Sequence, residues 1–386
     1  MASPVPPPGR NGNGRSDSVR RQVSVVTMVM VLGVAFIILA ALISLLGDPD
    51  AGEPRVVLKV EPHVRVPADV ISQPPPGPAP SSSAALIAAN GVIITDPALT
   101  EQTPDGPIPV IAPDGRRPMD LYARPFDKSD PRPRIAIVVT GLGIGEAITQ
   151  SAIDKLPPAV TLSFTPYGPA GLQSSVSAAR AVGHEVLLEL PMEPFDYPSN
   201  DPGPNTLMTG AAAADNPQHL QWLMSRISGY AGVSNMQGAK FLSVPEDLRP
   251  ILEQTKRRGL FFLDDGSAER SVLPEIATTA QAPAQRADSV IDRVPSREGV
   301  ESELRALEIA AKTRGSAIGV ATANPMTIDR ISAWAADLEQ KGIALAPVTA
   351  IIAAQQSAQA TPPAAPAPEL PRPPAQELPS TPESHD

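Results

Sequence analysis

The 386-residue sequence contains no cysteine, which excludes disulfide bridges and thiolate metal ligands. Histidine is scarce, with four in the whole chain, and aromatic residues make up only 3%. The net charge is −10, so the chain lacks the overall basic character of a nucleic-acid-binding protein, and we expect no nucleic-acid partner. The absence of cysteine also suits an oxidising compartment such as the periplasm.

One long stretch, Val23 to Leu46, lacks charged residues altogether. About 20 such residues suffice to cross the hydrocarbon core of a bilayer. Arginines precede the stretch, and the acids Asp48, Asp50 and Glu53 follow it. No small-residue cleavage site follows cleanly, so a signal peptide fits less well. The positive-inside rule then predicts a single-pass protein of the bacterial inner membrane, with a cytoplasmic N-terminus at 1–22, a transmembrane helix at 23–46 and the main domain in the periplasm.

Proline is abundant, with 48 residues, and most of them lie outside residues 134–353. Segments of this composition bury too little apolar surface to offset the entropy of ordering the chain. We therefore expect a proline-rich periplasmic tether at 47–133, with an ordered lead-in near 114–127, and a disordered proline-rich tail at 354–386. The folded domain is expected at 134–353.

Strand-like and helix-like segments alternate within this domain, a pattern that predicts a parallel sheet with outer helices. A (β/α) barrel and a doubly wound sheet both fit. The glycines of "GLGIG", after the first strand, lack the third position of a dinucleotide-binding fingerprint, which argues against a Rossmann fold. The expected strands are 134–139, 160–166, 185–192, 232–238, 260–265, 289–292, 317–322 and 343–348. The expected helices are 146–156, 172–183, 216–228, 248–259, 300–315 and 327–342.

Several motifs follow one another in a characteristic order, among them "LPPAVTLSFTPYG", "GHEVLLELPMEPFDYP", "NDPGPNTLMTG", "GYAGVSNMQGAKF", "RRGLFFLDDGSAERS" and "RGSAIGVATANPMTI". In this succession the domain resembles the divergent polysaccharide deacetylase family. The resemblance implies an α/β fold, a distorted (β/α) barrel of the polysaccharide deacetylase type preceded by one transmembrane helix. It also implies a pocket at the carboxyl ends of the strands and a link to carbohydrate metabolism in the envelope.

The metal-binding motifs of that family are degenerate here. Metal-dependent members carry an Asp-Asp pair, an Asn-His-Met-Gly motif and a Gly-His-Pro motif, whereas this chain has Thr140-Gly141, Asn235–Gly238 and Ala321–Ala323 at the matching positions. His184 and His219 are the only histidines of the domain, one opening a strand and the other within a helix. A hydrolytic zinc needs about three converging nitrogen or oxygen ligands. We therefore expect no metal and no cofactor.

Polar residues nevertheless remain at the strand ends. Asp264, Asp265 and Glu189 are the candidate catalytic groups, although neighbouring residues on a strand point to opposite faces, so one aspartate is expected to cap a loop. Glu189 could bind sugar hydroxyls or pair with Lys240, and Arg270 is another potential partner for the acids. A loop at 192–207 brings Phe195 and Tyr197 to the same rim, either to hold sugars or to seal the barrel. The candidate ligand-binding residues are Glu193, Asn235, Gln237, Lys240, Ser267 and Thr322.

Three functions follow from these patterns. The first is a periplasmic domain that is not catalytic and binds an envelope polysaccharide, peptidoglycan or another envelope protein. The second is an active carbohydrate esterase or hydrolase that uses the rim carboxylates without the usual metal. The third is an envelope scaffold whose proline-rich flanks matter more than its pocket.

Overall fold

The computed structural model describes residues 86–87 and 93–360, together with Met30, Gly33, Val34 and Phe36. The chain divides into two units, Met1–Ala79 and Pro80–Asp386, and the second is described here. The predicted membrane span at 23–46 lies almost entirely outside the described residues, as do most of the tether and the tail after Ala360. Within the described part of the chain, no helix is long and apolar enough to cross a membrane.

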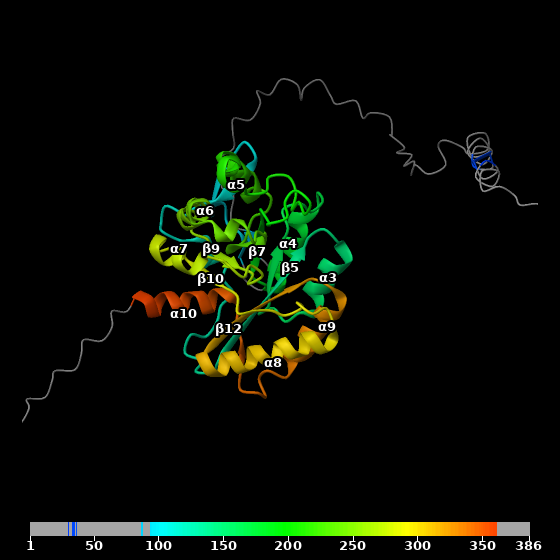
Figure 1. The fold of residues 1–386 in the computed structure, drawn as a ribbon. Coiled ribbons are helices and arrows are strands. Elements are labelled where there is room, and N and C mark those ends of the chain that lie inside the picture. The colour runs from blue at the N-terminus through cyan, green and yellow to red at the C-terminus, as the bar shows by residue number, and fades with distance from the viewer. Residues whose placement is uncertain (1–29, 31–32, 35, 37–85, 88–92, 361–386) are drawn as a thin grey trace, which may run out of the picture. The chain divides into compact units, whose positions relative to one another are not determined.

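A curled, all-parallel sheet forms the centre of the domain (Figure 1). Its strands follow the spatial order β10-β9-β8-β7-β6-β5-β12-β11, and β13 pairs with the start of β5. Strands and crossover helices alternate as the sequence predicts, and the result is an α/β half-barrel. The strands are β5 (Arg134–Leu142), β6 (Thr161–Phe164), β7 (Val186–Met192), β8 (Gly232–Gln237), β9 (Phe261–Asp264), β10 (Ala284–Arg286), β11 (Ser289–Val290), β12 (Ser316–Thr322) and β13 (Ala344–Leu345).

The two ends of this sheet are bridged by one short segment. The Ala287 N–H donates to the Asp264 carbonyl on β9 at 2.8 Å, and the next residue, Asp288, donates to the Ile318 carbonyl on β12 at 2.8 Å. Residues 284–291 therefore bond first to one end of the sheet and then to the other. This bridge holds the sheet in its curled form.

The crossover helices between the strands cover the outer face of the sheet. The α8 helix shows clear boundaries: the Ser296 hydroxyl accepts from the Gly299 N–H at its start, and Gly315 adopts a φ of 87° at its end. Both are the residue types that favour helix termini. The helices are α2 (Pro118–Leu121), α3 (Glu146–Lys155), α4 (Leu172–Val182), α5 (Asn216–Met224), α6 (Pro245–Arg257), α7 (Leu273–Ala280), α8 (Arg297–Arg314), α9 (Pro325–Ala336) and α10 (Val348–Ala360), with short 3-10 helices at Pro97–Leu99, Gly210–Asp215 and Phe241–Ser243.

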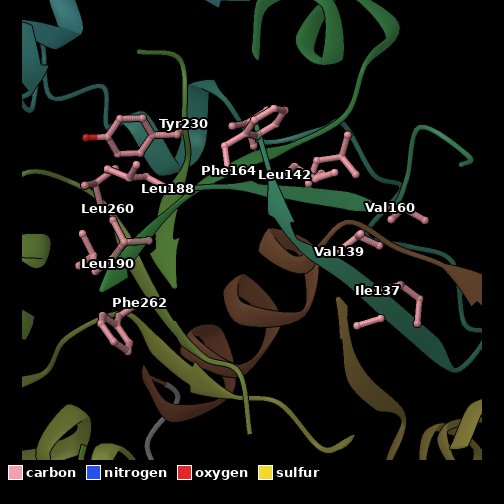
Figure 2. Packing of buried hydrophobic residues seen from close by; sticks show 14 of the residues in the cluster. Ile137, Val139, Leu142, Val160, Phe164, Leu188, Leu190, Tyr230, Leu260 and Phe262 are labelled. Carbon is pink, nitrogen blue, oxygen red and sulfur yellow. The ribbon is translucent and has the colours of Figure 1, made fainter. Parts of the chain in front are cut away.

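Alternating side chains along β5 divide the core into two clusters. Ile137 and Val139 join the outer cluster, which packs against the crossover helices. Figure 2 shows this cluster on neighbouring strands, including Leu188 of β7 and Phe262 of β9. Val138 joins the inner cluster, which α10 and the segment before β5 cover. Because the side-chain period of a strand is two, this division fixes which face every polar strand residue points to.

The structure differs from the sequence expectation at both borders of the domain. Secondary structure is present well before the expected lead-in. It comprises β1 (Leu86–Ile87), β2 (Ile93–Thr95) and a hairpin of β3 (Thr100–Thr103) and β4 (Gly106–Pro109). Arg180 secures this segment, because its guanidinium donates to the carbonyls of Tyr122 and Ile93 at 2.7 Å each. At the other border, α10 continues past Ala353 to Ala360, since alanine and glutamine favour helix until the prolines resume.

Candidate functional site

The carboxyl ends of the strands bring a group of inward-facing residues to one edge of the sheet, which we call the mouth. Thr140 and Thr322 are register partners on β5 and β12, two residues beyond the inner-cluster pair Val138 and Val320. The same alternation places Glu189 of β7, Met236 of β8 and Asp265 after β9 on the inner face. In α/β barrels and open sheets, ligand sites lie at this edge. The mouth consists of Thr140, Glu189, Met236, Asp265 and Thr322.

Glu189 is the most perturbed group of the mouth. Its side chain is almost fully buried, and Oε1 accepts a hydrogen bond from the Gly141 N–H at 2.5 Å. Burial raises the pKa of Glu189 to about 8, and the nearby charge of Asp265 adds to the rise. The carboxyl group is therefore mostly protonated at neutral pH. It can accept from Gly141 through one oxygen and donate to a ligand through the other.

Asp264 faces away from the mouth. It is the register partner of Arg286 on β10, and its Oδ2 lies 3.5 Å from Nε of that arginine. Its Oδ1 accepts from the Gly266 N–H at 2.8 Å, and burial raises the pKa of Asp264. Asp264 therefore holds the loop after β9, and Arg286, rather than the predicted Arg270, is the arginine beside it.

Asp265 faces the mouth. Its Oδ1 accepts from the Ser267 N–H at 2.8 Å and from the Ser267 hydroxyl at 2.6 Å, while its own N–H donates to Asn235 Oδ1 at 2.8 Å. Asn235 in turn donates through Nδ2 to the Gln237 carbonyl at 2.7 Å. Asn235 and Ser267 thus fix the strand ends and orient Asp265. The two adjacent aspartates point to opposite faces, so they do not form a catalytic pair.

Gln237 lies between the mouth and the loop above it. Its backbone has a φ of 59°, and Nε2 donates to Asn200 Oδ1 at 3.2 Å. Its Oε1 is buried and accepts no hydrogen bond from the described residues. A buried acceptor without a donor costs free energy, and a ligand donor at this position would remove that cost.

The loop over the mouth is held by an ion pair that the sequence analysis assigned differently. Lys240 Nζ lies 2.6 Å from Glu193 Oε1, and Lys240 therefore pairs with Glu193 rather than with Glu189. Thr209 donates to Glu193 Oε2 through both its N–H and its hydroxyl. Burial acts to raise the pKa of Glu193, but the hydrogen bonds from Lys240 and Thr209 outweigh it and lower the pKa. Glu193, at the start of the loop, is therefore bonded both to Thr209 at the end of the loop and to Lys240 after β8.

Exposed apolar side chains surround the mouth. Phe195 is 61% exposed and Tyr197 36% exposed on the loop after β7. Ile144 follows β5 and Val294 follows β11, and both are more than half exposed. All four residues follow the carboxyl ends of parallel strands, so they lie on the same face of the domain as the mouth. Exposed apolar groups beside polar ones are typical of a binding surface.

The family model described as divergent polysaccharide deacetylase matches residues 137–352, which include the sheet and the mouth. This chain belongs to the divergent polysaccharide deacetylase family. An uncharacterized protein of Agrobacterium tumefaciens, known from its crystal structure, is 41% identical, with a TM-score of 0.62, and the match covers 64% of this chain and 99% of that one. The uncharacterized Escherichia coli protein YibQ is 22% identical over 242 residues, which cover 62% of this chain and 74% of YibQ.

The residues of the mouth do not form a ligand set for a zinc ion. The mouth holds Thr140, Met236 and Thr322, and hydroxyl and thioether groups are poor zinc ligands. His184 lies at the opposite end of the strands, where its Nδ1 is 2.8 Å from the Val160 carbonyl. His219 lies on α5, with Nδ1 3.2 Å from the Thr206 carbonyl. Among residues 93–360, no cluster of histidine and acidic side chains could hold a metal ion.

Two partners of the mouth were missed by the sequence analysis. The Gly141 N–H is the donor to Glu189, and a glycine turn gives no signal that its amide serves a carboxyl 48 residues away. Asp292 accepts from the Thr322 N–H at 2.9 Å and so fixes the end of β12. The sequence signal for Asp292 was present, since it is the acid at the end of the expected strand 289–292.

Proposed function

We propose that this domain is a non-catalytic module that binds carbohydrate of the bacterial cell envelope at the mouth. The observation that carries the proposal is Glu189: a buried carboxyl, protonated at neutral pH, that faces the mouth beside Asp265. A folded protein retains a buried carboxyl at some cost in stability. Ligand binding is a function that repays this cost.

The groups of the mouth suit the hydroxyls and amides of a sugar. Glu189 offers a donor, and Asp265 and the Gln237 Oε1 atom offer acceptors. The Thr322 hydroxyl can do both, whereas the Thr140 hydroxyl donates to the Ala321 carbonyl at 3.2 Å and can only accept from a ligand. Phe195 and Tyr197 add exposed aromatic faces to the rim, and rings of this kind combine apolar area with few rotatable bonds. This combination fits a flat, hydroxyl-rich ligand.

The location of the domain supports the choice of ligand. We infer that residues 23–46 anchor the chain in the inner membrane and that the domain lies in the periplasm, as the charge pattern predicts. A mouth in that compartment faces peptidoglycan and other envelope polysaccharides. An envelope protein is the alternative partner for the same face.

The test is a binding titration of the purified chain with N-acetylglucosamine oligosaccharides and with soluble peptidoglycan fragments. Phe195→Ala is expected to weaken binding by about tenfold, because it removes an aromatic contact. Ile309→Ala is the matched control, since Ile309 is 68% exposed on α8, away from the mouth. Equal weakening by both variants, or no binding to either kind of glycan, would contradict the proposal.

Metal-independent hydrolysis is a second candidate. In this reaction a protonated Glu189 would act as the general acid and the charged Asp265 near it as the general base. Perturbed pKa values of this kind are frequent in active sites. This candidate requires release of acetate or cleavage of a glycosidic bond by the purified chain, with loss of turnover in Glu189→Gln. Glycan binding without turnover supports the binding module instead.

A further inference from the structure

A cavity lies beside strand β10, at the edge of the sheet. Its volume is about 820 Å³, within the range of ligand pockets. The end of α6, helix α7, strand β10 and the second half of α10 line it, together with residues at α2. Gly259, which precedes β9, and Arg286, which ends β10, both line the cavity, so it runs along the whole of β10.

Strand β10 presents backbone N–H groups to this cavity, whereas the Arg286 carbonyl accepts from Gln285 Nε2 at 3.3 Å. The Pro283 carbonyl accepts from the Phe262 N–H, and the Ala287 N–H donates to Asp264, both on β9. Alternate residues of a strand direct their backbone groups to opposite sides. The N–H groups of Ala284 and Arg286 therefore point away from β9, and both residues line the cavity.

The charge of the cavity is positive. Arg117, Lys256 and Arg286 line it, and none of its described lining residues is acidic. Arg117 is paired with Asp120, and Arg286 donates to the Gly266 and Ala268 carbonyls beside Asp264. Lys256 donates to the Ala280 carbonyl at 2.9 Å, and no ion pair joins it to a carboxylate of the described residues. Lys256 is therefore the cation that an anionic ligand would meet.

We propose that an extended acidic segment of a partner protein binds in this cavity and adds a strand to the free side of β10. Main-chain hydrogen bonds to Ala284 and Arg286 would supply the pairing, as in other cases of strand addition. Lys256 would select acidic side chains. Amide side chains of Gln281, Gln285, Gln355 and Gln356 surround the strand and offer further donors and acceptors to a peptide backbone. This site is independent of the mouth and of the function proposed for it.

The test uses the full chain and two labelled octapeptides, one of alternating glutamate and valine and one of alternating lysine and valine. Fluorescence anisotropy should show saturable binding of the acidic peptide and none of the basic peptide. Lys256→Glu should weaken the acidic peptide at least fivefold, whereas Lys312→Glu, the same charge change on α8, should not. Equal binding of the two peptides, or no effect of Lys256→Glu, would overturn the proposal.

The backbone contribution has its own readouts. Ala284→Pro removes an N–H that points to the free side and breaks no bond to β9, so it should keep the fold and abolish binding. In the unaltered chain, the Arg286 amide should exchange more slowly with solvent when the acidic peptide is present. If the Ala284→Pro variant does not fold, this exchange measurement on the unaltered chain still tests whether the peptide pairs with β10. Slow exchange without peptide that becomes fast on deletion of residues 361–386 would show that the chain fills its own cavity, which would also refute a partner peptide.

Discussion

Glu189 offers a quantitative prediction about the stability of the domain. Its pKa is about 8 in the folded protein, compared with an ordinary value of 4.5. An acid whose pKa rises on folding binds more protons in the folded state, so the free energy of unfolding decreases as pH increases between the two values. The difference of about 3.5 in pKa means that Glu189 alone removes about 3–4 kcal/mol between pH 5 and pH 8.

The variant Glu189→Gln isolates this contribution. Glutamine cannot ionise, and its carbonyl oxygen can still accept from the Gly141 N–H. Urea unfolding at pH 5 and pH 8 should show that the variant loses about 3–4 kcal/mol less than the unaltered chain over this interval. Glu185, whose pKa burial raises to about 7, titrates in both proteins and cancels in the comparison. The same pH dependence in both proteins would refute the argument that Glu189 is buried and protonated.

Three further predictions concern the loop over the mouth and the topology. Gly203→Ala should lower the free energy of unfolding by about 1–3 kcal/mol, because Gly203 has a φ of 128° and a Cβ there would lie 2.7 Å from the Tyr167 ring. Thermal melting measures this loss, and an unchanged melting temperature would contradict the prediction. Lys240→Met should cost about 1–2 kcal/mol, since it leaves Glu193 buried without its cation while Lys240 itself is partly exposed. The loss should shrink as the pH falls and Glu193 becomes protonated. A reporter that works only in the cytoplasm should remain inactive when fused after Ala360, and activity there would refute the predicted orientation.

The sequence predicted the general architecture because its signals are local. Apolar runs such as Ile135 to Val139 form strands, and they alternate with amphipathic segments that form helices. Strand β10 and helix α7 were missed, since "AQR" has no apolar run and α7 is only eight residues long. Helix α10 was also missed, because the last expected element was a strand at 343–348 and the proline-rich tail was expected from 354.

The site was predictable only in part because its partners are far apart in sequence. Motif positions indicated Glu189 and Asp265 as residues of the strand ends. The protonation of Glu189 depends on its complete burial and on Gly141, which only the folded chain brings together. The pairing of Lys240 with Glu193 depends on how the loop returns over the mouth. Neither the protonation of Glu189 nor the pairing of Lys240 with Glu193 can be predicted from local sequence patterns.

The central claim is that the mouth binds envelope glycan without a metal ion, and one calorimetric titration tests it most directly. The purified chain is titrated with a soluble peptidoglycan fragment, with and without a strong chelator, and the product is assayed for free acetate. We expect saturable binding that the chelator leaves unchanged, with no acetate released. Acetate release that stops when the chelator is added would contradict it.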